Sequence, residues 1–379
     1  MTIILFFGMI ILNLIFFLFR IRSNLVLFFN IIVFSFIYSG NIREDISDLY
    51  RYKLQYLNQY SWFQEKGYSF FSYIAAKIGI PFNLYLLIIF LIFIIALLFF
   101  CRKYQCNYSV FFLMFSLFYF FFVMEVLRFF LALSMLIIGS RFLIDGKKLA
   151  FIFFVLLATS FHLTFIIFFL LLVTTCEKFS NKFYYIYVSF FMLISVITIL
   201  NGMRVPFISG VFNILSSSFL DSKNLSFYNG MITAKNSWIY TTLYYFFNFL
   251  LLYISKKLIV FAKTEVNKKN IADISKLYMF CFRSNCLFSI VMPFSMMSPT
   301  YFRIIFVITL IIFILLSSII GELYNSKFNN GKIYINSSTV INDSTINLFI
   351  IITAWSVVWW YVNPNSATMI YALTQNMFY

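Results

Sequence analysis

The stretch FNLYLLIIFLIFIIALLFF, residues 82–100, decides the fold because it carries no charged side chain. About 20 such residues in an α-helix cross the ~30 Å hydrocarbon core of a bilayer. Runs of this kind recur along a chain that is 63% hydrophobic and only 11% charged. The sequence therefore predicts an all-α polytopic membrane protein.

Further segments are apolar enough to be predicted as spans: 2–19, 24–39, 107–124, 126–144, 183–200, 237–255, 271–295, 302–320 and 346–363. Two shorter apolar segments between 148 and 176 bring the total to about 12 transmembrane or re-entrant helices. We expect two external loops, at 40–81 and 201–236, within a single integral membrane domain over 1–379.

The segment 148–176 has two interpretations. If it were one tilted span, the basic loop 256–270 would lie outside, whereas short loops rich in lysine and arginine normally stay in the cytoplasm. If two short helices, 148–160 and 163–176, meet near His162, that loop is cytoplasmic. We therefore predict a break in the helix at His162, the only histidine of the chain.

The net charge of +16 is predicted to orient the chain and to complement anionic lipid headgroups. We therefore expect membrane lipids, and no nucleic acid, as partners. The five cysteines form no CxxC pair, and one histidine cannot complete a usual zinc site. Neither a disulfide framework nor a protein-ligated metal or cofactor is expected.

The external loop 40–81 is predicted to contain an amphipathic helix on the outer membrane surface. Its apolar residues at helical spacing are Ile46, Leu49, Tyr50, Leu54 and Leu57. The same loop holds acids and tyrosines, and carboxylates accept hydrogen bonds from sugar hydroxyls. Asp48, Tyr52 and Glu65 are therefore candidates for substrate binding. An interfacial helix anchored by an aromatic belt explains the tyrosines equally well.

Four cations lie in or next to predicted spans, and a fifth lies in the external loop 201–236. Arg128, Arg303 and His162 are predicted near the outer face, whereas Arg283 lies closer to the bilayer midplane. Arg204 begins the external loop 201–236 and could meet a lipid headgroup, although lone arginines at this depth are common. Charged groups within spans are candidates for function, and arginine suits phosphate because its guanidinium forms paired hydrogen bonds.

Two other readings of these cations remain open. Long side chains near helix ends often reach back to the headgroup region without any further role. Glu125 lies one helical turn before Arg128, and an ion pair between the two would be structural.

Several stretches together resemble the EpsG branch of the bacterial O-antigen and exopolysaccharide polymerases of Wzy type. They are Asp48 with Tyr52, EKGYSFFSYIAAKIGI (65–80), RFFLALSMLIIGSRFLIDGKK (128–148), LLATSFHLTFIIFFLL (156–171) and SPTYFRIIFVITL (298–310). The strongest part runs from Arg128 through a small-residue stretch and a basic turn to Phe161 and His162.

This resemblance implies a glycosyltransferase of the bacterial inner membrane, with an active site that faces the periplasm or the cell exterior. Its donor and acceptor would be glycans linked to undecaprenyl diphosphate, and a chain-length regulator protein would be a partner. Such an enzyme needs no nucleotide sugar, which agrees with a sequence that has no DxD motif and no glycine-rich phosphate loop.

The chemistry then assigns roles. Arg128 and Arg303 would stabilise the leaving diphosphate, with Arg283 as an additional ligand. His162 would take the proton of the acceptor hydroxyl, because an imidazole titrates near neutral pH. It could instead bind the diphosphate, or cap a turn by hydrogen-bonding the backbone that the helix break exposes.

Other functions remain as alternatives. A flippase or transporter of the lipid-linked oligosaccharide would be expected to show internal repeats or paired broken helices. An O-antigen ligase is expected to carry a very large external loop late in the chain, and a membrane acyltransferase would open its site to an acyl donor.

Overall fold

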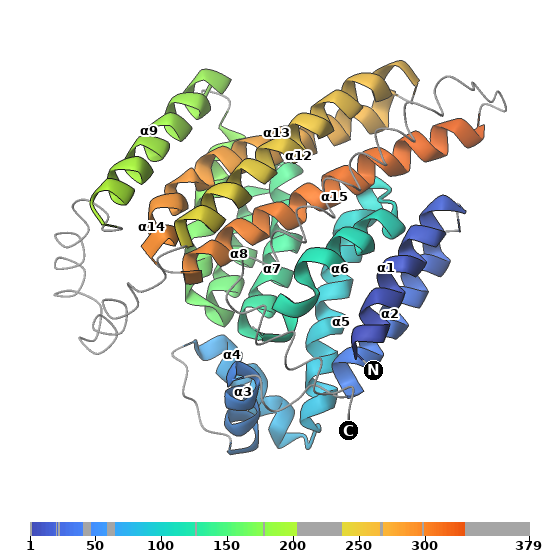
Figure 1. Cartoon of the computed structure of the whole chain (residues 1–379). Helices are drawn as coiled ribbons and strands as arrows, with labels where there is room; N and C mark the ends of the chain where they lie inside the picture. The colour runs from blue at the N-terminus through green and yellow to red at the C-terminus, as the bar shows by residue number, and fades with distance from the viewer. Residues whose placement is uncertain are drawn as a thin grey trace. The chain divides into compact units, whose positions relative to one another are not determined.

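The computed structural model (Figure 1) describes residues 2–19, 21, 23–40, 47–58, 65–125, 127–176, 179–202, 237–265, 268–297 and 299–329. Within these ranges the chain forms helices and no strand. The predicted span 346–363 and almost all of the predicted external loop 201–236 lie outside the described residues. The all-α prediction is confirmed for the part of the chain that is described.

The described residues form two compact units, each treated by itself. The first draws on Met1–Phe169, Ile259–Ile274 and Phe313–Tyr379, and the second on Leu170–Leu258 and Ser275–Ile312. The elements before the break at His162 are α1 (Thr2–Leu18), α2 (Ser23–Gly40), α3 (Ser47–Asn58), α4 (Lys66–Lys77), α5 (Phe82–Cys101), η1 (Arg102–Tyr104), α6 (Tyr108–Glu125), α7 (Leu127–Ile144) and α8 (Lys148–Phe161).

After the break come η2 (Leu163–Thr175), α9 (Asn181–Leu200), α12 (Ser237–Glu265), α13 (Lys268–Leu287), η3 (Phe288–Ile290), α14 (Val291–Met297) and α15 (Pro299–Asn329). Six described segments are long and apolar enough to cross a membrane: Phe82–Tyr104, Leu127–Ile144, Asn181–Leu200, Thr242–Ala262, Asn270–Phe294 and Arg303–Leu323. The count of about 12 spans stays a prediction.

Two helices run further than the apolar pattern predicts. α12 continues to Glu265 and α15 to Asn329, whereas the predicted spans end at 255 and 320. Much of the basic stretch 256–270, predicted as a loop, is therefore helical. Lysine, glutamate and alanine favour helix, so the chain keeps its winding after the apolar run has ended.

The predicted break at His162 is confirmed. α8 ends at Phe161, His162 has extended backbone angles (φ −152°, ψ 112°), and the chain then winds as η2. The prediction did not foresee that η2 is a 3-10 helix. Every third side chain of it is buried, namely Phe165, Phe168, Leu171 and Thr174. This spacing matches the three residues per turn of a 3-10 helix, so one face packs along its whole length.

In the first unit α7 lies against both α8 and α5. Gly139 allows the first of these contacts, because a methyl group there would come within 2.9 Å of the Phe154 side chain. Arg141 of α7 donates to the carbonyl of Phe99 at the end of α5, and Lys103 forms an ion pair with Asp145. These contacts fix the end of α7 opposite Arg128.

α1 and α2 are joined by two asparagines that are 0% exposed. The side-chain amides of Asn13 and Asn30 donate to each other at 2.9 Å in both directions. Each amide also donates to a carbonyl of its own helix, at Met9 and Val26. Interhelical amide bonds of this kind hold apolar helices together where burial alone gives little specificity.

The second unit contains a buried polar chain across three helices. Thr309 of α15 donates to the Asn248 side chain of α12 at 2.8 Å, and the Asn248 amide donates to Asn285 of α13 at 3.1 Å. Tyr245 donates to the backbone carbonyl of Asn285 at 2.8 Å. Hydrogen bonds between helices thus fix the register of this unit.

Candidate functional site

The candidate site of the first unit begins with α3 and α4, the two short helices of the predicted external loop. α3 buries Leu49, Tyr52 and Tyr56, whereas Tyr50 and Leu57 are exposed. The Tyr56 ring lies 4.8 Å from the ring of Tyr85 in α5, and its hydroxyl donates to the carbonyl of Ile80. Tyrosines at i and i+4 therefore attach α3 to the protein.

Tyr52 also meets α4, because its ring packs edge-on against Tyr68 at 5.6 Å. Burial raises the pKa of the Tyr68 phenol well above its ordinary value, so the hydroxyl stays neutral. From the sequence, the tyrosines of this loop were predicted either to bind sugar or to form an aromatic belt. In the structure, Tyr52, Tyr56 and Tyr68 pack against other aromatic rings of the protein. Their contacts place Tyr52 next to the first turn of α7.

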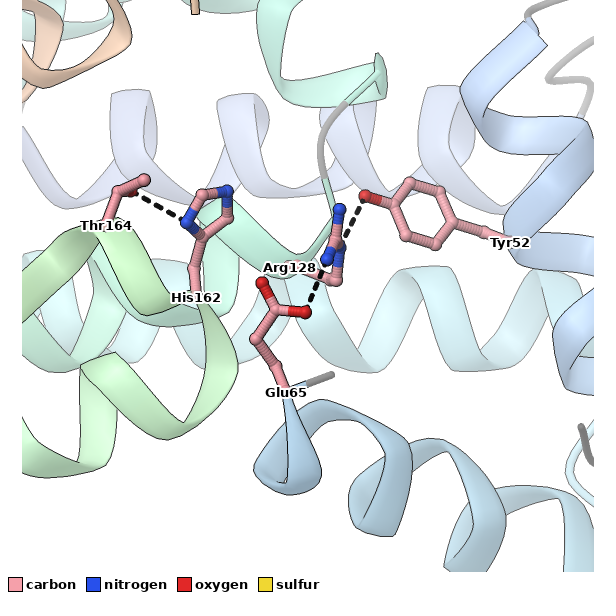
Figure 2. A network of polar contacts seen from close by, with 5 residues as sticks. All are labelled: Tyr52, Glu65, Arg128, His162 and Thr164. Carbon is pink, nitrogen blue, oxygen red and sulfur yellow. Dashed lines mark hydrogen bonds and ion pairs between the residues drawn. The ribbon is translucent and has the colours of Figure 1, made fainter. Parts of the chain in front are cut away.

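Arg128, in that first turn, is bound by two side chains from the loop (Figure 2). Its terminal nitrogen donates to Glu65 Oε2 at 2.6 Å, and its Nε donates to the Tyr52 hydroxyl at 3.2 Å. The side chains of Arg128 and Glu65 are 19% and 12% exposed, so water screens the ion pair only partly. The structure thereby brings together three predicted site residues that are far apart in sequence.

Glu65 precedes the first residue of α4 and has extended backbone angles (φ −76°, ψ 100°). Its side chain makes no capping bond to the helix that follows. A glutamate at this position usually contributes to helix stability, but here its carboxylate turns to Arg128 instead. Glu125, the alternative partner considered for Arg128, has a side chain outside the described set.

His162 lies at the helix break with its side chain largely buried. Its Nδ1 and the Thr164 hydroxyl are 2.8 Å apart, and its ring meets Phe129 and Phe165 edge-on at 5.8 and 5.9 Å. Phe129 follows Arg128 in α7, so the imidazole packs against the residue next to the one that carries the guanidinium. Figure 2 shows both side chains in one view.

A pocket of about 190 Å³ opens beside the ion pair. It is lined by Glu65 and Lys66 at the start of α4, by Thr159 and Ser160 at the end of α8, and by Leu163 just beyond the break. In the sequence, His162 lies between the lining residues Ser160 and Leu163. The pocket, the ion pair and the helix break therefore form one neighbourhood within the first unit.

Close contact between α4 and α8 shapes this pocket. A methyl group at Gly67 would lie 2.8 Å from the carbonyl oxygen of Ser160 and 2.8 Å from the Cβ of Ser160. Real Cβ atoms essentially never come this close to other heavy atoms. Glycine is therefore required here by space, since the first turn of α4 rests directly on the last turn of α8.

The remaining predicted site residues lie elsewhere. Asp48 is in α3, but its side chain is outside the described set, and Arg204 is outside it altogether. Arg283 and Arg303 belong to the second unit. Arg303 is half-buried near the start of α15. The predicted roles of all four in binding or catalysis stay predictions.

Arg283 has a well-defined environment within its own unit. Its terminal nitrogen donates to the backbone carbonyl of Thr174, near the end of η2, at 2.7 Å. The guanidinium lies over the ring of Tyr184 at 5.6 Å. A cation at a helix carboxyl end is favourable, and these contacts favour a structural role.

The polar groups of the site are oxygen and nitrogen donors and acceptors. Within the described ranges no three His, Cys, Asp or Glu side chains gather as a metal site would require. The side chains that could bind a ligand are instead the guanidinium, the carboxylate, the lysine and the hydroxyls of the pocket. This set suits an anion at one end and a polyhydroxyl molecule at the other.

Four polar residues near the site were not predicted from the sequence: Lys66, Thr159, Ser160 and Thr164. A signal existed for the last three, because they are the nearest polar residues to His162 in an otherwise apolar run. No signal in the sequence distinguishes Lys66 from the other lysines of the chain.

Comparison with known proteins gives one finding. The model of the EpsG family matches residues 26–372, which is nearly the whole chain. No curated protein and no solved structure matches it significantly.

Proposed function

The chain belongs to the EpsG family, which suggests a membrane glycosyltransferase-type polysaccharide polymerase, and we propose that its substrates are lipid-linked. In this proposal the donor and the acceptor are oligosaccharide repeat units on undecaprenyl diphosphate. The product is O-antigen or a related surface polysaccharide. The protein lies in the inner membrane of a bacterium, with its site facing the periplasm or the cell exterior.

The observation that carries the proposal is the pairing of Arg128 with Glu65 beside a pocket. A guanidinium at the start of a membrane-length helix is costly to keep, and such groups normally serve a substrate path or a site. Its present partner is a carboxylate, which a diphosphate can replace because both anions accept paired hydrogen bonds. Arg128 is thus suited to the diphosphate of a lipid carrier.

The reaction breaks the bond between the anomeric carbon and the diphosphate oxygen of the donor. The electron pair of that bond leaves with the lipid diphosphate, whose charge increases as the bond lengthens. Arg128 stabilises this charge, and its hydrogen bond to Tyr52 orients the guanidinium beforehand. A cation that is oriented before the reaction does not have to reorganise while the charge develops.

The acceptor hydroxyl attacks the same anomeric carbon and loses its proton. His162 takes this proton in the proposal, and the Thr164 hydroxyl holds its ring through Nδ1. Edge-on contacts with Phe129 and Phe165 limit rotation of the imidazole. The ring is mostly buried, so in this proposal the substrate reaches it through the break between α8 and η2.

Three other predicted residues are included in the proposal as ligands. Arg303 serves as a second cation for the diphosphate, Arg204 as a further substrate ligand, and Asp48 as an acceptor for sugar hydroxyls. Arg283 is left out of this set, because its contacts with Thr174 and Tyr184 favour a structural role. A chain-length regulator protein is the expected partner. Neither a metal nor another cofactor enters any step.

Deletion of the gene, followed by electrophoresis of the surface glycan, tests the proposal. A polymerase deletion is expected to lose the long ladder while a single repeat unit remains, and the wild-type chain should restore the ladder. Chains with Arg128→Ala or Arg303→Ala should not. Loss of every repeat unit would instead favour a flippase or a ligase, and an unchanged ladder would contradict the proposal.

A further inference from the structure

We propose that the pocket lined by Glu65, Lys66, Thr159, Ser160 and Leu163 binds one sugar of the lipid-linked glycan through hydroxyl groups that donate hydrogen bonds. This inference rests on the proposed function and names the ligand of one part of its site. It separates a sugar subsite from the diphosphate position at Arg128.

The hydroxyls of the pocket have already used their protons. Thr159 donates to the carbonyl of Val155 at 2.8 Å, and Ser160 donates to that of Leu157 at 2.7 Å. A hydroxyl has one proton and two lone pairs. Towards the pocket both residues therefore offer lone pairs, which accept hydrogen bonds.

Glu65 adds further acceptor capacity. One of its oxygens accepts from Arg128, but a carboxylate has about four acceptor positions over its two oxygens. Three of the five lining side chains therefore accept hydrogen bonds, whereas only Lys66 donates through its side chain. The matching ligand is a molecule with several O–H or N–H donors and some acceptors, which describes a sugar.

The same count argues against phosphate in this pocket. A phosphate oxygen accepts hydrogen bonds and is anionic, so it would face the lone pairs of two hydroxyls and the negative charge of Glu65. One lysine does not offset these three groups. Leu163 adds an apolar surface that is 53% exposed, against which the C–H face of a sugar ring can pack.

The location of the pocket fits the chemistry of the proposed reaction. It shares Glu65 with the Arg128 ion pair, and two of its walls flank His162 in sequence. A sugar bound here has the anion position on one side and the helix break on the other. Its hydroxyls are thus within the neighbourhood where a glycosidic bond would form or break.

The test measures binding of two probes to the full chain in detergent by isothermal titration. The first probe is the repeat-unit oligosaccharide, released from its lipid by mild acid and free of phosphate. The second is undecaprenyl diphosphate without sugar. Thr159→Val and Ser160→Ala should each weaken the oligosaccharide about 2- to 10-fold, the usual value of one neutral hydrogen bond, and leave the lipid diphosphate unchanged.

Matched controls separate the pocket from general effects on the helices. Thr198 and Ser134 also donate to carbonyls of their own helices, at 2.8 Å each, but neither lines the pocket. Thr198→Val and Ser134→Ala should bind both probes as the wild type does. Thr159→Ser, which keeps the hydroxyl, should retain oligosaccharide affinity within about twofold.

The outcomes distinguish this inference from the proposed function. The sugar subsite alone would be overturned if Thr159→Val and Ser160→Ala bound the oligosaccharide as tightly as the wild type does. A wild-type chain that binds only the lipid diphosphate, or pocket variants that lose both probes equally, would also overturn it. A folded wild-type chain that binds neither probe would count against the proposed function itself.

Discussion

Arg128 and Arg283 both lie in membrane-length helices, and each has an aromatic ring near its guanidinium, Tyr52 at 5.8 Å and Tyr184 at 5.6 Å. They differ in what accepts their hydrogen bonds. Arg128 donates to the side chains of Glu65 and Tyr52, whereas Arg283 donates to the backbone carbonyl of Thr174.

In the proposed function, this difference distinguishes an arginine that binds a ligand from one that makes a structural contact. A carboxylate side chain can turn away when a stronger anion arrives, so the partner of Arg128 is replaceable. The carbonyl near the end of η2 is held by the winding of the chain and cannot leave without unwinding it. The partner of a buried arginine is thus more informative than its depth in the membrane.

Arg128→Ala provides the largest expected effect. We expect turnover of lipid-linked repeat units to fall on the order of 10³–10⁵, by analogy with arginines that stabilise phosphate charge during transfer. Protein abundance should stay near normal. Arg128→Lys should restore part of the rate, because a single ammonium lacks the paired donors. Turnover is measured on purified protein in detergent, and a fully active alanine variant would remove Arg128 from the site.

His162→Gln tests the imidazole that packs against Phe129, the residue after Arg128. If the imidazole is the base, turnover should fall on the order of 10²–10⁴ while insertion and substrate binding persist. A purely structural histidine predicts another result, because glutamine can still bond Thr164 and the backbone at the break. In that case glutamine would be nearly as active as the wild type, and His162→Ala would lower abundance instead.

Arg283→Ala is the matched test at the other arginine. Loss of a charge-assisted bond to Thr174 should lower the free energy of unfolding by about 1.5–3 kcal/mol. Turnover per folded molecule should remain within about twofold. Thermal unfolding in detergent and turnover at equal amounts of folded protein give both values. A large loss of turnover without loss of stability would make Arg283 a substrate ligand, as sequence analysis predicted.

Gly67→Ala tests the packing of α4 on α8, which places Glu65 next to Arg128. The added methyl group meets Ser160, so α4 must move from α8, at a cost of about 1–3 kcal/mol. We expect lower thermal stability and weaker pairing of Glu65 with Arg128. Gly8→Ala is the control, because nothing lies within 4 Å of a methyl group there. Equal stability of the two variants would show that α4 adapts freely.

The sequence predicts the helices and the break at His162 because hydropathy and charge are local properties of the chain. It does not predict that Arg128 pairs with Glu65, 63 residues away, since that choice depends on how α3 and α4 pack. Spacing along the chain instead suggests Glu125, which lies one helical turn before Arg128. Contacts between distant segments decide the site, and a pattern read along one chain does not contain them.

The winding of η2 was missed for a different reason. Ten of its 13 residues are apolar, so the sequence pattern does not distinguish a period of 3.0 residues from one of 3.6. Burial of Phe165, Phe168, Leu171 and Thr174 resolves the period only in the folded protein. The ends of α12 and α15 were misplaced because a helix can continue beyond the apolar run on which a span is predicted.

The amide pair between Asn13 and Asn30 bears on the order in which the chain is assembled. If the first helix lay alone in hydrocarbon, it would expose the side-chain amide of Asn13. The backbone of that helix satisfies only part of the hydrogen-bonding capacity of this amide. Its partner is 17 residues away along the chain, so it emerges from the ribosome soon afterwards. The first two helices can therefore leave the insertion machinery as a closed pair, and later helices such as α5 and α6 pack on a finished surface.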